Sequence, residues 1–369
     1  MPDTIIGSIW PTIQKDTLSY VYGAGVITLI IQCGTVISSL YSSKLVYKYS
    51  TRIVTFFSII LTSIALILFS LSYNFIFLII ASVPLGIGAG SVDAALNGYA
   101  AKYFSSNVMN FLHGFWGIGA FAGPFIMSMF IKYEISWRIG YILISFILII
   151  IIAIVVFISK KYWIKEESMQ VQNEYVTNIK ALTLPLVKPA LLSFSFFSYI
   201  ELTTGLWISS FLVFCFNLSS SYAAFITALY YGSITLGRLI TGVFSHKFQN
   251  HILIRTGEII VILGCILMAS NSLHIAITGI LLIGLGSSPI YPAMLHSTPK
   301  IFGEKATLTI MGLQMAVTYT GGATAPLIFG LMADKFSFSI LPFFILFGAL
   351  IIFILSEYLN YKIKVNKII

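Results

Sequence analysis

Long apolar runs, separated by short polar stretches, make up almost the whole of this 369-residue chain. An apolar run of about 20 residues is long enough to cross the hydrocarbon core of a bilayer as a helix. The pattern predicts helical spans at 1–13, 18–41, 53–72, 75–99, 108–131, 138–159, 189–214, 221–245, 252–270, 273–297, 307–332 and 337–359. Since the first run is too short to cross alone, we expect an all-α membrane protein of twelve spans whose first span is incomplete.

The longest polar segment, residues 160–188, lies between the sixth and seventh spans. It divides the chain into an N-terminal half, residues 1–159, and a C-terminal half, residues 189–369. Each half holds six of the predicted spans. We therefore expect two six-helix bundles joined by a central loop.

Composition supports a membrane protein, because 58% of the residues are hydrophobic and only 9% are charged. A soluble globular protein carries about 25% charged residues. The three cysteines lie inside apolar runs at no metal-ligand spacing, and the chain lacks the phosphate-binding and hydrolytic motifs of common enzymes. We expect no metal, no cofactor and no enzymatic activity.

The net charge of +9 reflects short basic loops rather than a basic groove for nucleic acid. If residues 160–188 are cytoplasmic, the outer loops hold only four of the 21 basic residues, namely Lys15, Lys132, Arg138 and Lys335. An excess of Lys and Arg on the cytoplasmic side is typical of membrane proteins. The pattern predicts a multi-pass protein of the plasma membrane with the central loop and C-terminus in the cytoplasm. The preference for Lys over Arg favours a bacterial source.

The two halves repeat at a fixed offset of 198 residues. Asp3 and Gly7 of "DTIIG" correspond to Glu201 and Gly205 of "ELTTG". Repeated halves are typical of secondary transporters, whose substrate sites lie between the repeats near the bilayer midplane. Because the counterpart of the seventh span would start several residues before Met1, we also expect the full gene product to begin upstream.

Three acidic residues lie inside predicted spans, namely Asp3, Asp93 and Glu201. A charge at the centre of a membrane helix costs about 2.5–3.5 kcal/mol on insertion scales, so such residues commonly mark ion and substrate paths. We predict that all three take part in proton coupling. The alternative is a structural carboxyl that is hydrogen-bonded to a neighbouring helix.

Polar side chains near these acids predict a solute site. Asn97 follows Asp93 by four residues and shares its helix face. Asn110, His113 and Trp116 form one stripe on the next span. An indole ring beside amide and imidazole groups suits a sugar, although packing is the alternative for Trp116.

The C-terminal half contributes further candidates. We predict that Trp207, Tyr291, Gln314 and Tyr319 contact the solute and that Arg238 acts in gating, or alternatively contacts a lipid headgroup. Arg255 precedes Glu258 by three residues, a spacing that predicts an ion pair at the membrane surface.

Several of these segments together resemble the major facilitator superfamily, in particular its fucose–galactose–glucose:proton symporter group. They are "GIGAGSVDAALN", "MNFLHGFWGIGAFAGP", "ELTTGLW" and "GLGSSPIYP". The resemblance covers almost the whole chain. It implies the two-bundle fold of that superfamily, with Asp3 and Asp93 in the positions of the proton-coupling acids and Asn97 beside the second.

The resemblance and the repeat together predict a monomeric secondary transporter in the lipid bilayer. We expect it to move a small polar solute, most simply a sugar, with protons by alternating access. An exporter of drugs or metabolites with the same fold is the first alternative. A non-transporting membrane sensor or inactive paralogue is the second.

Overall fold

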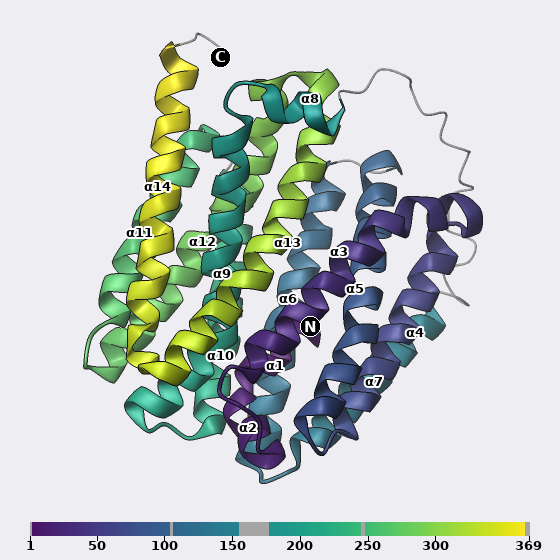
Figure 1. Ribbon diagram of the computed structural model, residues 1–369, viewed down its shortest axis with the longest axis vertical. Helices are drawn as coiled ribbons and strands as arrows, with labels where there is room; N and C mark the ends of the chain where they lie inside the picture. Colours follow the sequence, from purple (N-terminus) through teal and green to yellow (C-terminus); the bar gives the residue numbers. More distant parts are fainter. Residues whose placement is uncertain (1, 104–105, 155–176, 245–247, 366–369) are drawn as a thin grey trace.

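The computed structural model describes residues 2–103, 106–154, 177–244 and 248–365. All elements in these ranges are helices, arranged as two side-by-side bundles (Figure 1). Ten of them are long and apolar enough to cross a membrane. The predicted all-α membrane fold is confirmed.

The N-terminal half comprises helices α1 to α7. Their bounds are α1 Pro2–Ser8, α2 Trp10–Thr17, α3 Gly23–Tyr49, α4 Thr51–Ser70, α5 Phe75–Tyr103, α6 Ser106–Lys132 and α7 Trp137–Ala153. The first predicted span is split into α1 and α2 because Pro11 has no N–H to donate to the preceding turn. Helix formation nevertheless continues to Thr17, four residues beyond the apolar run that we predicted.

The C-terminal half comprises helices α8 to α14. Their bounds are α8 Asn178–Thr183, α9 Val187–Phe216, α10 Ser220–Phe244, α11 Asn250–Met268, α12 Leu273–Phe302, α13 Glu304–Lys335, the 3-10 helix η3 Phe338–Ile340 and α14 Leu341–Val365. Asn217, which caps the C-terminus of α9, has a left-handed conformation, which Asn adopts more readily than most residues. The long helices extend beyond several of the predicted apolar runs at their polar ends.

The internal repeat is visible in how the helices pack. Within the N-terminal half, α3 packs on α5, α5 on α4, and α4 on α7. The equivalent pairs of the C-terminal half, α10 with α12, α12 with α11 and α11 with α14, pack in the same way. Between the halves, α6 packs on α10 and α3 on α13, which are again equivalent pairs. The repeat in the sequence thus corresponds to a repeat in the fold.

Helices α1 and α9 cross closely at two glycines that the repeat relates. A Cβ atom added at Gly7 would lie 2.6 Å from Cα of Leu206 and 2.9 Å from the carbonyl oxygen of Gly205. Small residues at such crossings let the backbones of membrane helices approach. Asp3 and Glu201 each precede one of these glycines by four residues, so the crossing places the two acids at similar levels along α1 and α9.

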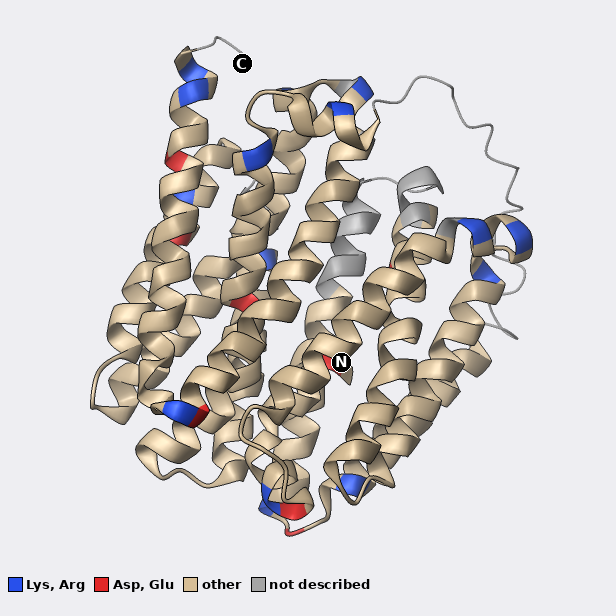
Figure 2. Ribbon diagram, in the orientation of Figure 1, with Lys and Arg blue, Asp and Glu red and all other residues tan. Residues whose placement is uncertain are grey.

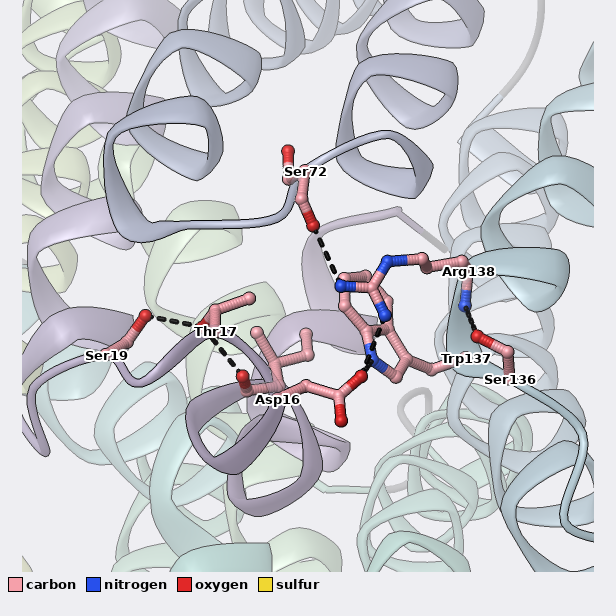
Figure 3. A network of polar contacts seen from close by, with 8 residues as sticks. Asp16, Thr17, Ser19, Ser72, Ser136, Trp137 and Arg138 are labelled. Carbon is pink, nitrogen blue, oxygen red and sulfur yellow. Dashed lines mark hydrogen bonds and ion pairs between the residues drawn. The ribbon is translucent and has the colours of Figure 1, made fainter.

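Charged residues gather toward the two ends of the bundles and are sparse between them (Figure 2). At the predicted outer end, Asp16 accepts hydrogen bonds from Nε1 of Trp137 at 2.8 Å and from Arg138 at 2.7 Å (Figure 3). Arg138 also donates to the carbonyl oxygen of Ser72 at 3.0 Å. Burial raises the pKa of Asp16, but these hydrogen bonds and the charge of Arg138 outweigh it, so the net pKa is lowered. This network ties α2 to α7 and to the loop after α4.

Candidate functional site

Asp93 and Asn97 lie one helical turn apart on α5, at the inner face of the N-terminal half. The amide Nδ2 of Asn97 donates to Oδ1 of Asp93 at 2.9 Å. Asp93 is exposed although it lies inside an apolar helix. The amide oxygen of Asn97 is buried and has no hydrogen-bond partner in the described part of the chain. The pair therefore combines an exposed carboxylate with a buried amide oxygen whose hydrogen-bonding capacity is unused.

Tyr319, on α13 of the other half, donates from its phenol to Oδ2 of Asp93 at 3.0 Å. Both oxygens of Asp93 thus accept a hydrogen bond, one from its own helix and one from across the interface. Hydrogen bonds to an ionised acceptor are stronger than neutral ones, at about 1.5–3 kcal/mol. The contact joins the two halves through a titratable group.

Asp3 lies on α1 and is exposed, close enough to Asp93 for the two carboxyl groups to interact electrostatically. The charges of Asp93 and Glu201 in turn both act on Tyr291. Electrostatic interactions therefore link the three acids that the sequence singled out, directly for Asp3 and Asp93 and through Tyr291 for Asp93 and Glu201.

Glu201 and Arg238 form a second polar contact, between α9 and α10, with 3.6 Å between Oε1 and the guanidinium nitrogen. Arg238 also lies over the ring of Trp116, on α6 of the other half, 4.8 Å from its centroid. A cation over an indole face is attracted by the ring quadrupole. Trp116 keeps 40% of its surface exposed, so the contact leaves part of the ring free.

Of the remaining C-terminal candidates, Trp207 and Gln314 are enclosed by protein and Tyr291 is partly open. Trp207 has no exposed surface, and its indole N–H donates to the carbonyl oxygen of Pro326 at 2.9 Å. The amide of Gln314 is buried and bonds the hydroxyl of Thr298. Tyr291 lies between two phenyl rings with part of its surface open. In this conformation Trp207 and Gln314 pack within the C-terminal half rather than lining the interface.

The side chains of Asn110 and His113, two of the predicted solute contacts, lie outside the described part of the structure. Among the described residues, no group of three or more His, Cys, Asp and Glu side chains could hold a metal ion.

Two further acidic residues, Glu258 and Glu357, lie close together away from the interface. Glu258 does not pair with Arg255, which contradicts our prediction. Arg255 instead makes two 2.7 Å hydrogen bonds to Glu357 on α14. Glu258 is fully buried and accepts from the hydroxyl of Ser356 at 2.7 Å. The true partners come from a helix about 100 residues away, which no local spacing could reveal.

Two curated proteins are similar to the chain in sequence. The glucose/mannose transporter GlcP of Bacillus subtilis is 24% identical over 303 residues, covering 79% of this chain and 74% of that protein. Bypass of stop codon protein 6 of Saccharomyces cerevisiae is 23% identical over 381 residues, covering 93% of this chain and 76% of that protein.

Solved structures share the fold at low sequence identity. An inward-facing, unoccupied bacterial homologue of the human lysosomal transporter Spinster superposes with a TM-score of 0.72 at 15% identity, covering 96% of this chain and 93% of that one. A variant of the E. coli fucose:proton symporter superposes with a TM-score of 0.66 at 16% identity, covering 97% and 94%. The family profile described as Major Facilitator Superfamily matches residues 1–247 and 190–362. With helices that pack in the same pattern in both halves and this match along nearly the whole sequence, the chain belongs to the Major Facilitator Superfamily.

Proposed function

We propose that this transporter moves a sugar or a similar hydroxylated solute together with protons. The observation that carries the proposal is the hydrogen bond from Tyr319 to Asp93, because it connects a titratable carboxylate to the opposite half. The activities of two similar proteins, a glucose/mannose transporter and a fucose:proton symporter, support the solute class and the coupling ion.

Proton coupling would act through the charge of Asp93. While ionised, this carboxylate accepts from both Asn97 and Tyr319 and favours the arrangement in which the halves meet there. A proton on Asp93 removes the charge and weakens both bonds. Asp3 interacts with Asp93 electrostatically, so protonation of Asp93 would also change the charge that acts on Asp3. A ligand or proton can shift the equilibrium between two conformations only by the difference in its affinity for them. The hydrogen bond between Tyr319 and Asp93 would supply such a difference, because it favours the ionised form of Asp93 in the conformation where the halves meet.

Solute recognition would use the polar and aromatic groups beside this acid. The unpaired amide oxygen of Asn97 suits a hydroxyl donor, and the exposed part of Trp116 suits the apolar face of a sugar ring. We retain Asn110, His113, Tyr291 and Tyr319 as solute contacts. Trp207 and Gln314 would support the site from behind, because both are enclosed by protein.

Arg238 would act as part of a gate. It lies on the C-terminal half, pairs loosely with Glu201 and covers part of Trp116 on the N-terminal half. Separation of the halves would break the contact between Arg238 and Trp116 while leaving the pair with Glu201 intact. We propose that the protein works as a monomer in the plasma membrane, with residues 160–188 and the C-terminus in the cytoplasm.

Uptake into proteoliposomes tests the proposal. The purified protein should accumulate labelled glucose, mannose or fucose when a pH gradient is imposed and should only equilibrate the solute when the gradient is collapsed by a protonophore. Liposomes without protein serve as the control. Accumulation driven by a sodium gradient alone, or transport restricted to apolar cations, would overturn the proposal and favour a different ion or an exporter.

A further inference from the structure

A groove with a volume of about 830 Å³ lies away from the acidic site, between α13 and α14. Both helices pack against α9 and touch each other little, so α9 forms the floor of the groove. The groove is lined by Ser195, Phe196, Tyr199, Gly321, Thr324, Ile328, Met332, Phe336, Ile340, Phe343, Phe344 and Phe347. We refer to it as the α13–α14 groove.

The lining suits an apolar occupant. Six of its residues are aromatic. The phenol of Tyr199 already donates to the carbonyl oxygen of Phe344 at 2.8 Å, and the hydroxyl of Thr324 donates to the backbone carbonyl oxygen of Thr320 at 2.9 Å. A polar solute would therefore lose its hydration here and gain few hydrogen bonds, which is unfavourable.

The groove opens toward the bilayer. Phe343 and Phe347 are 61% and 60% exposed, and Ile328 is 50% exposed. These residues lie on helices that are long and apolar enough to cross the membrane. In a membrane-spanning chain, exposed phenyl rings at these positions face acyl chains rather than water.

Length and charge favour a lipid with a phosphate group. Along α13, the lining runs from Gly321 to Met332, a rise of about 16 Å at 1.5 Å per residue, and Phe336 continues it just after the helix ends. One leaflet of the hydrocarbon core is about 15 Å thick, so the groove reaches from near mid-membrane to the interface. There it ends beside Lys335, an exposed cation in the last turn of α13 that forms no ion pair within the described ranges.

We propose that the α13–α14 groove binds one acyl chain of a phospholipid whose phosphate contacts Lys335. The inference does not depend on which solute the protein transports, because the groove lies on the outer side of α9 and α13. The lipid would fill the space that α13 and α14 leave open over α9.

Photo-crosslinking tests the proposal. The full chain is reconstituted with phosphatidylglycerol that carries a diazirine on one acyl chain, illuminated and digested, and the adducts are mapped by mass spectrometry. We expect adducts to concentrate on Ile328, Met332, Phe343 and Phe347 rather than on Leu331 and Leu350, which are exposed on the same helices but do not line the groove.

Two matched variants make the test specific. Ile328→Trp fills the groove, whereas Leu331→Trp adds the same ring outside it. Ile328→Trp should lower the groove adducts about tenfold, which corresponds to the loss of roughly two buried methylene contacts, and Leu331→Trp should leave them unchanged. Met332→Phe, a milder filling change, replaces Ile328→Trp if that variant does not elute as a monodisperse protein.

The headgroup is tested separately. Lys335→Gln should reduce the adduct yield with phosphatidylglycerol relative to phosphatidylcholine of the same chains, and Asp334→Asn, one residue earlier, should not. Equal labelling around the whole lipid-facing surface, adducts insensitive to both filling variants, or crosslinks joining two copies of the chain through the groove would each overturn the proposal.

Discussion

The phenol of Tyr319 and the carboxylate of Asp93 are separated by 226 positions in the sequence and by 3.0 Å in the fold. They belong to opposite halves of a two-half transporter, so their hydrogen bond exists only while the halves are arranged as they are here. The bond also requires an acceptor on Asp93. The protonation state of Asp93 and the arrangement of the two halves are therefore linked by one hydrogen bond.

We predict that Asp93→Asn abolishes accumulation driven by a pH gradient while solute exchange remains measurable. An amide keeps the shape and one acceptor oxygen but cannot take up or release a proton. Paired assays of uphill uptake and of exchange at equal pH check this. If the variant still concentrates solute, the coupling acid lies elsewhere, with Asp3 and Glu201 as the next candidates.

Tyr319→Phe should have a different effect, because it removes the donor and leaves the titratable group. We expect the hydrogen bond that is lost to be worth about 1.5–3 kcal/mol. The balance between the two conformations should shift accordingly, and transport should slow by about tenfold or more. Coupling to protons should persist, because Asp93 can still take up and release a proton. A Tyr319→Phe variant that transports at the wild-type rate but no longer responds to a pH gradient would contradict the role that we assign to Tyr319.

Asp16→Asn should lower the free energy of unfolding of the purified protein by about 1 kcal/mol, since it removes the charge that Trp137 and Arg138 bind while the side chain stays partly exposed. The cost should depend on pH. The pKa of Asp16 is lowered in the fold from 3.8, so its contribution is fully present above pH 3.8 and is lost as the pH falls through the lowered value.

Thermal unfolding in detergent from pH 3 to pH 6, at closely spaced values, measures this dependence. The curves of the wild type and of Asp16→Asn should differ at the upper end of the range and approach each other below pH 3.8. A constant difference across the range would mean that the carboxylate charge is not what stabilises the network.

Gly7→Ala should lower stability by about 1–3 kcal/mol, because the added methyl group would meet the backbone of α9 and force the helices apart. Gly312→Ala is the matched control. A Cβ at Gly312 would meet nothing within 4 Å, so the better helix former should be neutral or stabilise by up to about 1 kcal/mol. Folded yield and unfolding temperature of the two variants provide the comparison.

Sequence periodicity was sufficient to predict the helices and their repeat. The offset that pairs Gly7 with Gly205 predicted equivalent positions, and the structure places these two glycines at a single crossing. Such features are readable because bilayer thickness fixes the length of a span and close packing requires small residues. The break at Pro11 follows from local chemistry alone.

The rotation of a helix about its own axis was harder to predict. Helix α9 is apolar on nearly all sides, so nothing in its pattern indicated that Trp207 would be enclosed while Glu201 faces Arg238. Hydrogen-bond partners on helices distant in sequence could not be predicted either. Asp93 and Tyr319 were each singled out, but their pairing depends on how α5 and α13 approach in three dimensions.

The pair of Glu201 and Arg238 permits a test that separates charge balance from proton transfer. Both side chains are largely buried, and their charged atoms lie 3.6 Å apart. Removing one partner of a buried pair leaves an uncompensated charge and is strongly destabilising, at about 3–5 kcal/mol, whereas removing both is often tolerated. Arg238→Gln should therefore lower stability and uptake sharply, and Glu201→Gln should cost less because Arg238 keeps its contact with Trp116.

The double variant Glu201→Gln with Arg238→Gln should recover stability relative to Arg238→Gln alone, with a coupling energy of about 1–3 kcal/mol in a double-mutant cycle. The solute accumulation and exchange of this double variant then distinguish the two possible roles of Glu201. If accumulation driven by a pH gradient returns with stability, Glu201 serves only to balance Arg238, and coupling rests on Asp93 and Asp3. If the stable double variant exchanges solute but no longer accumulates it, Glu201 carries a proton during the cycle. Additive single effects would mean that the 3.6 Å contact contributes nothing, because two residues that do not interact show no coupling energy.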